Sequence, residues 1–181
     1  MWTYVNKLRV VPVTEREDLL AAPVVAALRE LDPELAARCG VCEIDPDLAD
    51  TAAFCERYDV PLDASANCVV VAGKRAGEQR YAACLVLATT RADVNGVAKR
   101  RLDVRKASFA PMADAVGLTG MEYGGITPFG LPDSWPVLLD PAVAQAGEVV
   151  VGSGVRRSKL VVPGAVLAAL PHAEVLEGLG V

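Results

Sequence analysis

The sequence contains a single histidine, His172, which follows Pro171 in a terminal segment. One histidine in this place offers no Ser-His-Asp or Cys-His arrangement that would activate a side-chain nucleophile. Any chemistry that the chain performs must therefore do without such a base.

Long apolar runs and a secretory leader are also missing. No stretch approaches eighteen apolar residues, and the first residues, MWTYVNKLRVVPVTERED, carry charges too early for the apolar core of a signal peptide. We therefore expect a cytoplasmic protein with no membrane partner.

The cysteines are too few and too scattered for a scaffold of disulfides or metal. Of the five, Cys55, Cys68 and Cys84 lie within apolar or helical patterns, as reduced thiols do. Cys39 and Cys42 have the CxxC spacing of redox and zinc sites, but no second CxxC or histidine pair completes a zinc site. We expect neither metal nor cofactor. A thiol redox protein stays open as an alternative, and it would require a low-pKa thiolate at Cys39 or Cys42.

What is present indicates one compact domain. The 181 residues are 52% hydrophobic, with mean hydropathy +0.31 and no repeat or linker composition, so we expect a single domain over residues 1–181. Periodicity predicts helices at residues 14–30, 47–58, 112–116 (with Ser108 as cap), 141–146 and 163–170. Apolar and β-branched runs predict strands at residues 40–44, 67–72, 81–89, 137–139, 148–152 and 159–162. The predicted fold class is α/β (α+β), with a mixed, mostly antiparallel sheet core surrounded by helices.

Charge is distributed unevenly along the chain. Residues 1–65 carry 13 acids and 6 bases, whereas residues 66–170 carry 8 acids and 12 bases, within a total net charge of −5. One face of the later part can therefore meet phosphates although the whole molecule is acidic. The bases expected to hold phosphates are Arg100, Arg101, Arg156, Arg157 and Lys159, and the alternative is a solvated charged surface.

Glycine is concentrated in one segment, Thr119–Pro132, which reads TGMEYGGITPFGLP. Four glycines and two prolines in this stretch predict a loop of special shape rather than a helix or strand. Such a loop exposes backbone amides that can converge on an oxyanion, although glycine richness by itself indicates only a tight turn.

This segment, followed about twenty residues later by EVVVGSGVRRSKLVV, resembles the YbaK and prolyl-tRNA synthetase-associated editing domain family. The hallmark of that family is a Gly-Gly-Val-Ser-Pro-Phe-Gly-like loop with a Gly-Gly or Ser-Gly turn downstream. The resemblance covers roughly residues 20–170 and includes the segment DTAAFCERYDVPLDASAN.

The resemblance implies an aminoacyl-tRNA deacylase that clears a small, wrongly attached amino acid from the 3′ end of tRNA. It also implies that the loop backbone holds the ester while water, or a nucleophile supplied by the substrate itself, attacks it. The expected partner is aminoacyl-tRNA and not DNA, with an aminoacyl-tRNA synthetase as a second expected partner. The loop implied to act on the ester comprises Gly124, Gly125, Ile126, Thr127 and Pro128. The residues implied to bind substrate are Asn67, Tyr123, Phe129, Gly152, Ser153 and Gly154. Tyr123 and Trp135 flank the loop, where an aromatic ring either stacks on the terminal adenine or packs in the core.

The chain departs from the family pattern at two positions. Where relatives commonly have an Ala-Lys-Thr-like triplet with a substrate-site lysine, this chain reads Ala66-Asn67-Cys68, and Lys74 is no evident replacement. Asn67 can donate and accept hydrogen bonds but supplies no charge. Where many relatives have an aspartate, this chain has Val166. The alternatives are therefore a deacylase with changed specificity, a deacylase that uses other groups, and a non-catalytic module that binds a tRNA end or a small ligand.

Overall fold

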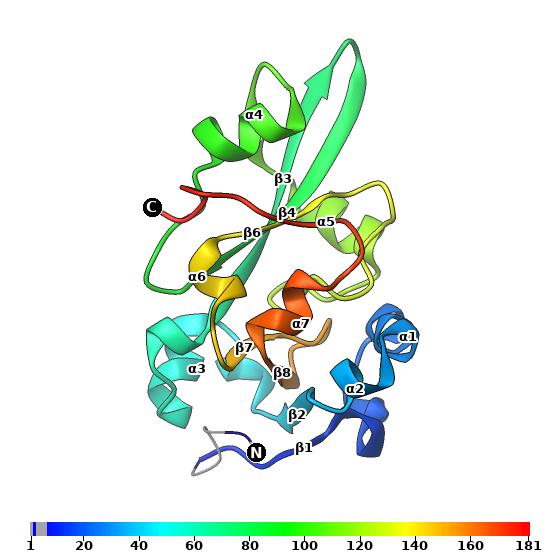
Figure 1. The fold of residues 1–181 in the computed structure, drawn as a ribbon, viewed down its shortest axis with the longest axis vertical. Helices are drawn as coiled ribbons and strands as arrows, with labels where there is room; N and C mark the ends of the chain where they lie inside the picture. The colour runs from blue at the N-terminus through cyan, green and yellow to red at the C-terminus, as the bar shows by residue number, and fades with distance from the viewer. Residues whose placement is uncertain (1, 3–6) are drawn as a thin grey trace.

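The computed structural model describes residue 2 and residues 7–181, and it shows a mixed α/β domain built on two β-sheets (Figure 1). The first sheet has the order β1-β2-β8-β7, and the second has the order β5-β3-β4-β6-β9. Pairing is antiparallel except where β6 joins β4 and β9. The predicted fold class is confirmed, but the strands divide into two sheets rather than one.

The predicted strands are all present, with somewhat different ends. They are β2 (Gly40–Glu43), β3 (Ala66–Arg75), β4 (Glu78–Leu87), β6 (Val137–Leu139), β7 (Val149–Gly152) and β8 (Ser158–Val162). The structure adds three short strands that the sequence did not reveal: β1 (Val10–Pro12), β5 (Ala107–Phe109) and β9 (Ala173–Val175). Three residues are too few to show an alternating pattern, so these strands are recognisable only from their partners.

The longest pairing is the hairpin of β3 and β4, in which Arg75 faces Glu78 across a two-residue turn. Ala76 and Gly77 both have positive φ, 50° and 80°, which matches the twist of a tight hairpin. Cysteine, valine and alanine side chains from the middle of these strands are buried, so this hairpin forms the spine of the larger sheet.

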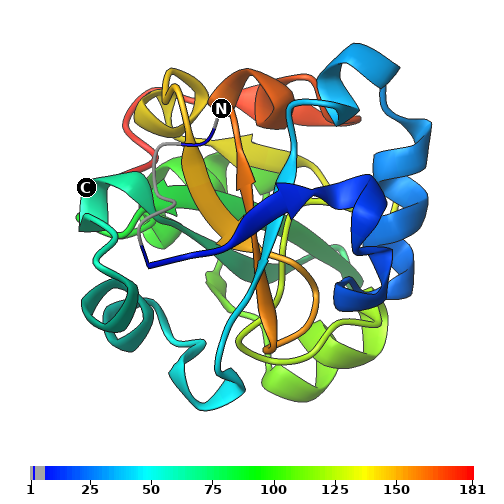
Figure 2. The same ribbon diagram turned by 90° about the horizontal axis from the view of Figure 1, so that it is seen from below.

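The helices surround the sheets, as Figure 2 shows from below. They are α1 (Ala22–Glu30), α2 (Pro33–Ala36), α3 (Thr51–Tyr58), α4 (Lys99–Leu102), α5 (Met112–Thr119), α6 (Pro141–Ala144) and α7 (Gly164–Ala168). A π-helical turn, Val94–Ala98, leads into α4. Among the described residues, no helix is long and apolar enough to cross a membrane.

Three predictions at helix N-termini were wrong. The helix expected at residues 47–58 is a 3-10 turn (Pro46–Leu48) followed by α3, which begins only at Thr51. The helix expected at residues 14–30 begins only at Ala22, after two 3-10 turns, because Pro23 lacks an N–H and fits only the first turn of a helix. Ser108 does not cap α5, because it lies in β5 opposite Ala72, and Pro111 occupies the N-cap instead.

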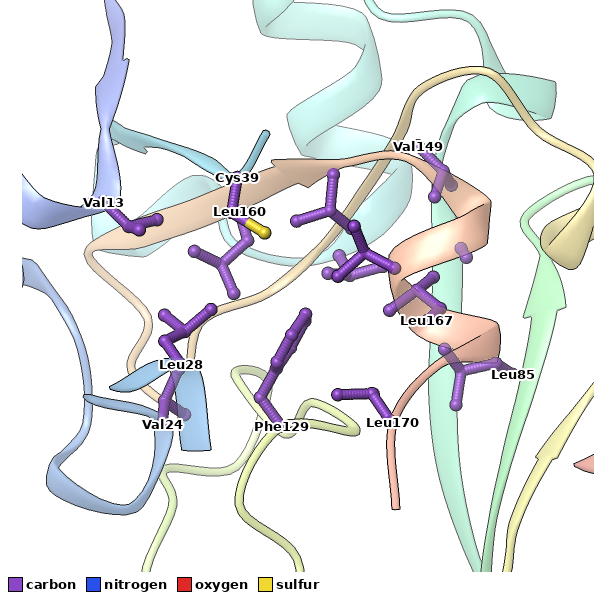
Figure 3. Close-up of a cluster of buried hydrophobic side chains, with 14 of the residues drawn as sticks. Val13, Val24, Leu28, Cys39, Leu85, Phe129, Val149, Leu160, Leu167 and Leu170 are labelled. Carbon is purple, nitrogen blue, oxygen red and sulfur yellow. The ribbon is translucent and has the colours of Figure 1, made fainter. Parts of the chain in front are cut away.

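The largest core cluster lies between the smaller sheet, α1 and α7 (Figure 3). Phe129 extends from the glycine-rich segment into its centre, next to Leu28, Leu160 and Leu170. The segment is thus anchored in the core by one ring, while the residues before it remain at the surface.

Candidate functional site

A cleft of about 320 Å³ opens where the two sheets meet. A single bridge between Ser65 and Val150 connects the sheets just beside it. Its walls come from separate parts of the chain: residues 49–51, residues 66–70 of β3, the end of β5 at Phe109, α5 at Ala115, the loop residues Tyr123, Gly124 and Ile126, then Gly152 and Lys159. The cleft therefore contains both the glycine loop and the position where relatives carry a lysine.

Asn67 lies in this cleft at the start of β3. Its Oδ1 accepts a hydrogen bond from the hydroxyl of Thr51, the first residue of α3, at 2.5 Å. The side-chain amide nitrogen of Asn67, Nδ2, has no acceptor among the described residues. It is a fixed donor that a substrate oxygen can use.

The glycines of the loop allow its backbone to touch a second turn. A Cβ at Gly125 would lie 2.8 Å from three backbone atoms of Val155, and the carbonyl of Gly125 accepts from the amide of Gly154 at 2.7 Å. Gly124 has φ +89°, a conformation that side chains rarely adopt, and the guanidinium of Arg156 occupies the space of its missing Cβ. The loop and the turn at residues 152–156 therefore form one unit.

This packing changes which amides can act on a substrate. The amide of Gly125 is occupied, since it donates to the carbonyl of Glu122 at 2.9 Å. The amides of Gly124 and Ile126 have no acceptor among the described residues, and both residues line the cleft. The two available backbone donors therefore lie on either side of Gly125, whose own amide is occupied.

The remaining loop residues point away from the cleft. Thr127 is fully buried, and its hydroxyl has no hydrogen-bond partner among the described residues. Pro128 lines a separate cavity of about 100 Å³, together with His172 and Trp135. Phe129 is fully buried in the core, so its ring packs against apolar side chains and does not line the cleft.

Ser153 and Gly154 pack against buried groups next to the glycine loop. The hydroxyl of Ser153 is buried within 3.1 Å of the carbonyls of Val155 and Ser158 and 2.6 Å from the Ser158 hydroxyl. Gly154, with φ +88°, fits against Ala21 of the segment before α1. Of the three predicted turn residues, only Gly152 lines the cleft. Ser153 and Gly154 make their contacts within the protein interior.

Arg156 and Arg157 are already bonded within the protein. The Arg156 guanidinium contacts the carbonyls of Pro46 and Tyr123 at 3.2 and 3.3 Å and the carboxylate of Asp50 at 3.5 Å. The exposed Arg157 donates to the carbonyl of Asp18. Arg156 therefore ties the loop to the segment before α3.

Arg100 and Arg101 lie on α4, at the far end of the β3–β4 hairpin (Figure 1). Arg75, which pairs with Asp103 beside α4, is eight residues along β3 from Asn67, or about 26 Å. Arg101 is bound to Glu174, with 2.8 Å between Nε and Oε1, whereas Arg100 is exposed. These bases lie well away from the cleft.

Lys159 has a different position from the one its sequence context indicated. Only 8% of the residue is exposed, and its ammonium lies 5.4 Å above the ring of Phe54 while the residue lines the cleft. Burial lowers the pKa of Lys159. The side chain faces the interior of the cleft, so it can meet only a phosphate that enters the cleft.

The cysteines do not have the environment of redox thiols. Cys39 and Cys42 are buried, and desolvation raises their pKa to about 11 and about 12. Cys68 lines the cleft, but burial raises the pKa of its thiol as well. A reactive thiolate needs the opposite shift, so the redox alternative loses its physical basis.

Several cleft residues were not predicted as site residues, although Asp50 and Thr51 begin the segment DTAAFCERYDVPLDASAN that is part of the resemblance. Asp50, Thr51 and Phe109 come from segments that the chain brings together only on folding, and Phe109 is 64% exposed at the edge of the cleft. Tyr123, also exposed, does line the cleft, whereas Trp135 is buried and stacks on Tyr81 at 5.1 Å between ring centroids. Among the described residues, the aromatic rings that line the cleft are therefore those of Phe109 and Tyr123.

Solved structures share this fold. One, described as a candidate trans-editing enzyme for prolyl-tRNA synthetase, is 21% identical, covers 87% of this chain and 97% of its own, and superposes with a TM-score of 0.70. The hypothetical protein APE2540 is 18% identical, with 86% and 99% of the two chains covered and a TM-score of 0.72. At this identity the likeness shows the fold alone.

No curated protein matches the chain by sequence. The profile of the aminoacyl-tRNA editing domain, however, matches residues 45–170, which include the glycine loop, Asn67 and Lys159. That span is well over half of the chain and contains every wall of the cleft. The chain therefore belongs to the aminoacyl-tRNA editing domain family.

Proposed function

We propose that this protein is a cytoplasmic aminoacyl-tRNA deacylase that acts in trans and hydrolyses the ester of a small, mischarged amino acid. The observation that carries the proposal is the pair of unbonded backbone amides, at Gly124 and Ile126, in a cleft that also holds the free amide of Asn67. Fixed donors of this kind stabilise the charge that develops on a carbonyl oxygen during acyl transfer.

The reaction needs no side-chain nucleophile. Water, assisted by a hydroxyl of the substrate, adds to the ester carbonyl carbon while the amides of Gly124 and Ile126 receive the developing oxyanion. The ester C–O bond then breaks, the ribose oxygen leaves as a hydroxyl with one proton of the attacking water, the second proton passes to the solvent, and the amino acid leaves as a carboxylate. One oxyanion donor of this type is worth about 10²–10³ in kcat.

The size and lining of the cleft favour a small amino acid beside a nucleoside. Val70, Ala110, Ala115 and Ile126 supply an apolar wall of modest side chains. Phe109 and Tyr123 stand exposed at the cleft, where a terminal adenine can stack on either ring. An apolar wall separates neighbouring amino acids by only about 1–3 kcal/mol, so selection among small amino acids is expected to be partial.

The rest of the tRNA is expected to meet the basic residues outside the cleft. Arg100 is exposed and free to meet a phosphate, while Arg101 and Arg157 would have to exchange an internal partner for one. A synthetase that releases the mischarged tRNA is the second expected partner.

The decisive experiment is deacylation of a panel of tRNAs charged with small amino acids. We expect hydrolysis of at least one member without added metal, and hydrolysis of none would remove the enzymatic proposal. Asn67→Ala should lower kcat/KM by about tenfold or more, because a donor to the substrate is lost. Asn95→Ala is the matched control, since Asn95 is exposed on the π-helical turn outside the cleft.

A non-catalytic module that binds the tRNA end is the second candidate, favoured by Val166. This residue, in the place of a family aspartate, is fully buried in the core, so it cannot hold the amino group of a substrate. Tight binding of aminoacyl-tRNA without turnover of any panel member would favour this second function.

A further inference from the structure

Lys159 is a buried cation that has no counter-ion among residue 2 and residues 7–181. Strand β8 presents it between Gly152 of β7 and Cys42 of β2, and its side chain passes over Phe54 to the cleft. Its ammonium makes no hydrogen bond or ion pair with any residue that the structure describes. Burying an ammonium without a partner is costly, so such a group usually serves a ligand.

The charged groups nearest to Lys159 do not neutralise it. Asp50 and Arg156 both influence its pKa, but the Asp50 carboxylate is 3.5 Å from Arg156 and belongs to that pair. The desolvation of the ammonium outweighs the attraction of Asp50, which is why the pKa of Lys159 is lowered. The inner part of the cleft therefore carries one uncompensated positive charge.

The N-terminus of α3 adds to this positive environment. Asp50 occupies the N-cap without bonding to the helix through its side chain, so the first amides of α3 are not capped. Thr51, the first residue of the helix, lines the cleft, as does Asn67 with its free amide nitrogen. Uncapped helix amides next to a cation form an environment suited to phosphate.

We propose that Lys159, the N-terminus of α3 and the amide of Asn67 form a phosphate subsite in the cleft, which holds the 5′-phosphate of the terminal nucleotide of the substrate. Lys159 thereby supplies, from β8, the charge that Asn67 does not supply from β3. Lys159 is a positioning residue: it fixes the nucleotide so that the ester carbonyl reaches the amides of Gly124 and Ile126. The assignment of this phosphate to tRNA rests on the proposed function. The binding of a phosphate at this place does not depend on it.

The test compares AMP with adenosine by NMR titration of the full chain, which measures weak affinities. We expect the wild-type protein to bind AMP at least about tenfold more tightly than adenosine. Lys159→Met, which keeps the apolar stem over Phe54, should bind both ligands alike, with adenosine affinity unchanged. Lys159→Arg should keep the preference, because it keeps the charge, whereas a lysine acting as a base would not be replaced by arginine.

Lys74→Met is the matched control, since Lys74 is exposed near the hairpin turn, and it should behave as the wild type. Inorganic phosphate, added to the wild-type protein, should shift the amide signals of Thr51 and Asn67 and displace AMP more than adenosine, a measurement that requires no variant to fold. Equal binding of AMP and adenosine by the wild type, or a preference that survives in Lys159→Met, would overturn the proposal. Displacement of AMP by free alanine but not by phosphate would also overturn the proposal, because Lys159 would then bind the carboxylate of the amino acid.

Failure of this proposal is distinguishable from failure of the proposed function. If no charged tRNA is hydrolysed but the AMP preference depends on Lys159, the phosphate subsite stands and the deacylase does not. If hydrolysis occurs and AMP shows no preference, the deacylase stands and the subsite does not.

Discussion

Gly125 shows how a single hydrogen in place of a side chain sets the shape of the site. Its Cα faces the backbone of Val155, and its carbonyl holds the amide of Gly154, so the loop and the turn approach more closely than any side chain allows. The glycine is required for this approach rather than for a free amide, because its own N–H is bonded to Glu122.

Gly125→Ala is therefore expected to destabilise the fold by about 1–3 kcal/mol, since backbone at 2.8 Å from the new Cβ cannot rotate away. Gly117→Ala is the control: no atom lies within 4 Å of its new Cβ, and it is inside α5, where alanine is favoured by up to about 1 kcal/mol. Urea unfolding of both variants measures the difference. Equal effects of the two substitutions would contradict the packing described for Gly125.

Two phenylalanines close to the site have opposite roles. Phe129→Ala should cost about 3–5 kcal/mol of unfolding free energy, because the fully buried ring leaves a cavity in the main core. Phe109→Ala should leave the stability within about 1 kcal/mol and weaken adenosine binding by about 1–3 kcal/mol, since the exposed ring would lose its stacking contact. Thermal unfolding and adenosine titration separate the two, and a stable Phe129→Ala variant with weakened binding would reverse the assignment.

At the scale of the elements, Arg156 connects three segments that are distant in sequence. It belongs to the turn after β7, fills the space above Gly124 and reaches Pro46 and Asp50 before α3. Because its contacts are partly exposed, they add little to global stability, but they set the distance between two walls of the cleft.

Arg156→Met is expected to change the unfolding free energy by less than about 1 kcal/mol and to lower deacylation by about tenfold to a hundredfold, because the loop amides move relative to the substrate. Arg157→Met is the matched control, since Arg157 bonds to the carbonyl of Asp18 outside the cleft. Steady-state kinetics of both variants give the comparison. A similar loss in Arg157→Met would show that the effect is a general loss of positive charge.

At the scale of the whole molecule, the charge is negative but unevenly placed. The acidic residues are concentrated in residues 1–65, while exposed bases such as Arg100 belong to the basic part of the chain. Affinity for tRNA should therefore fall with salt in spite of the net charge of −5, because each phosphate contact releases counter-ions.

Arg100→Ala should weaken tRNA binding and lower the slope of log K against log salt by about 1. Arg29→Ala should leave the slope unchanged, since Arg29 lies on α1 and is paired with Glu17. Filter binding over a range of salt concentrations measures both slopes. An unaltered slope in Arg100→Ala would mean that Arg100 of α4 does not contact tRNA.

The buried thiols make the stability of the whole molecule sensitive to alkaline pH. Folding raises the pKa of Cys39 from 9.0 to about 11 and those of Cys42 and Cys84 to about 12. A group with a raised folded pKa contributes stability below its unfolded pKa and loses it above. The free energy of unfolding should therefore fall between about pH 9 and 12, by up to about 1.4 kcal/mol per pH unit for each thiol.

Lys159 has the opposite effect on stability, because its pKa is lower in the folded protein than in the unfolded chain. Burying the charged ammonium costs free energy, and this cost disappears as the lysine loses its proton on the way to pH 10.5. Urea unfolding from pH 7 to 10 measures the free energy of unfolding at each pH. Compared with the wild type, this free energy should fall less steeply with pH in Cys84→Ala and more steeply in Lys159→Met. A flat profile above pH 9 would mean that the thiols ionise equally in the folded and unfolded chain.

The sequence by itself determined the fold class, the two central strands and the glycine loop. Local patterns encode these features: β-branched and apolar runs on either side of a polar stretch, and glycines too dense for a helix or strand. The strands extend further into that polar stretch than predicted, so that only Ala76 and Gly77 form the turn. The short strands and the start of α1 escaped, because three-residue strands depend on their neighbours and the effect of Pro23 outweighed the apolar periodicity around it.

Only the tertiary structure decided which residues meet in the cleft. It turned Phe129, Ser153 and Gly154 toward the packed interior, left the amides of Gly124 and Ile126 unbonded, and brought Thr51 and Asn67 together. It also placed Lys159 in the same cleft as Asn67, the position where relatives have a lysine. Such placements depend on strand register and on contacts between distant segments, which no local pattern encodes, because a shift of one residue in β8 would turn Lys159 to the opposite face of the sheet.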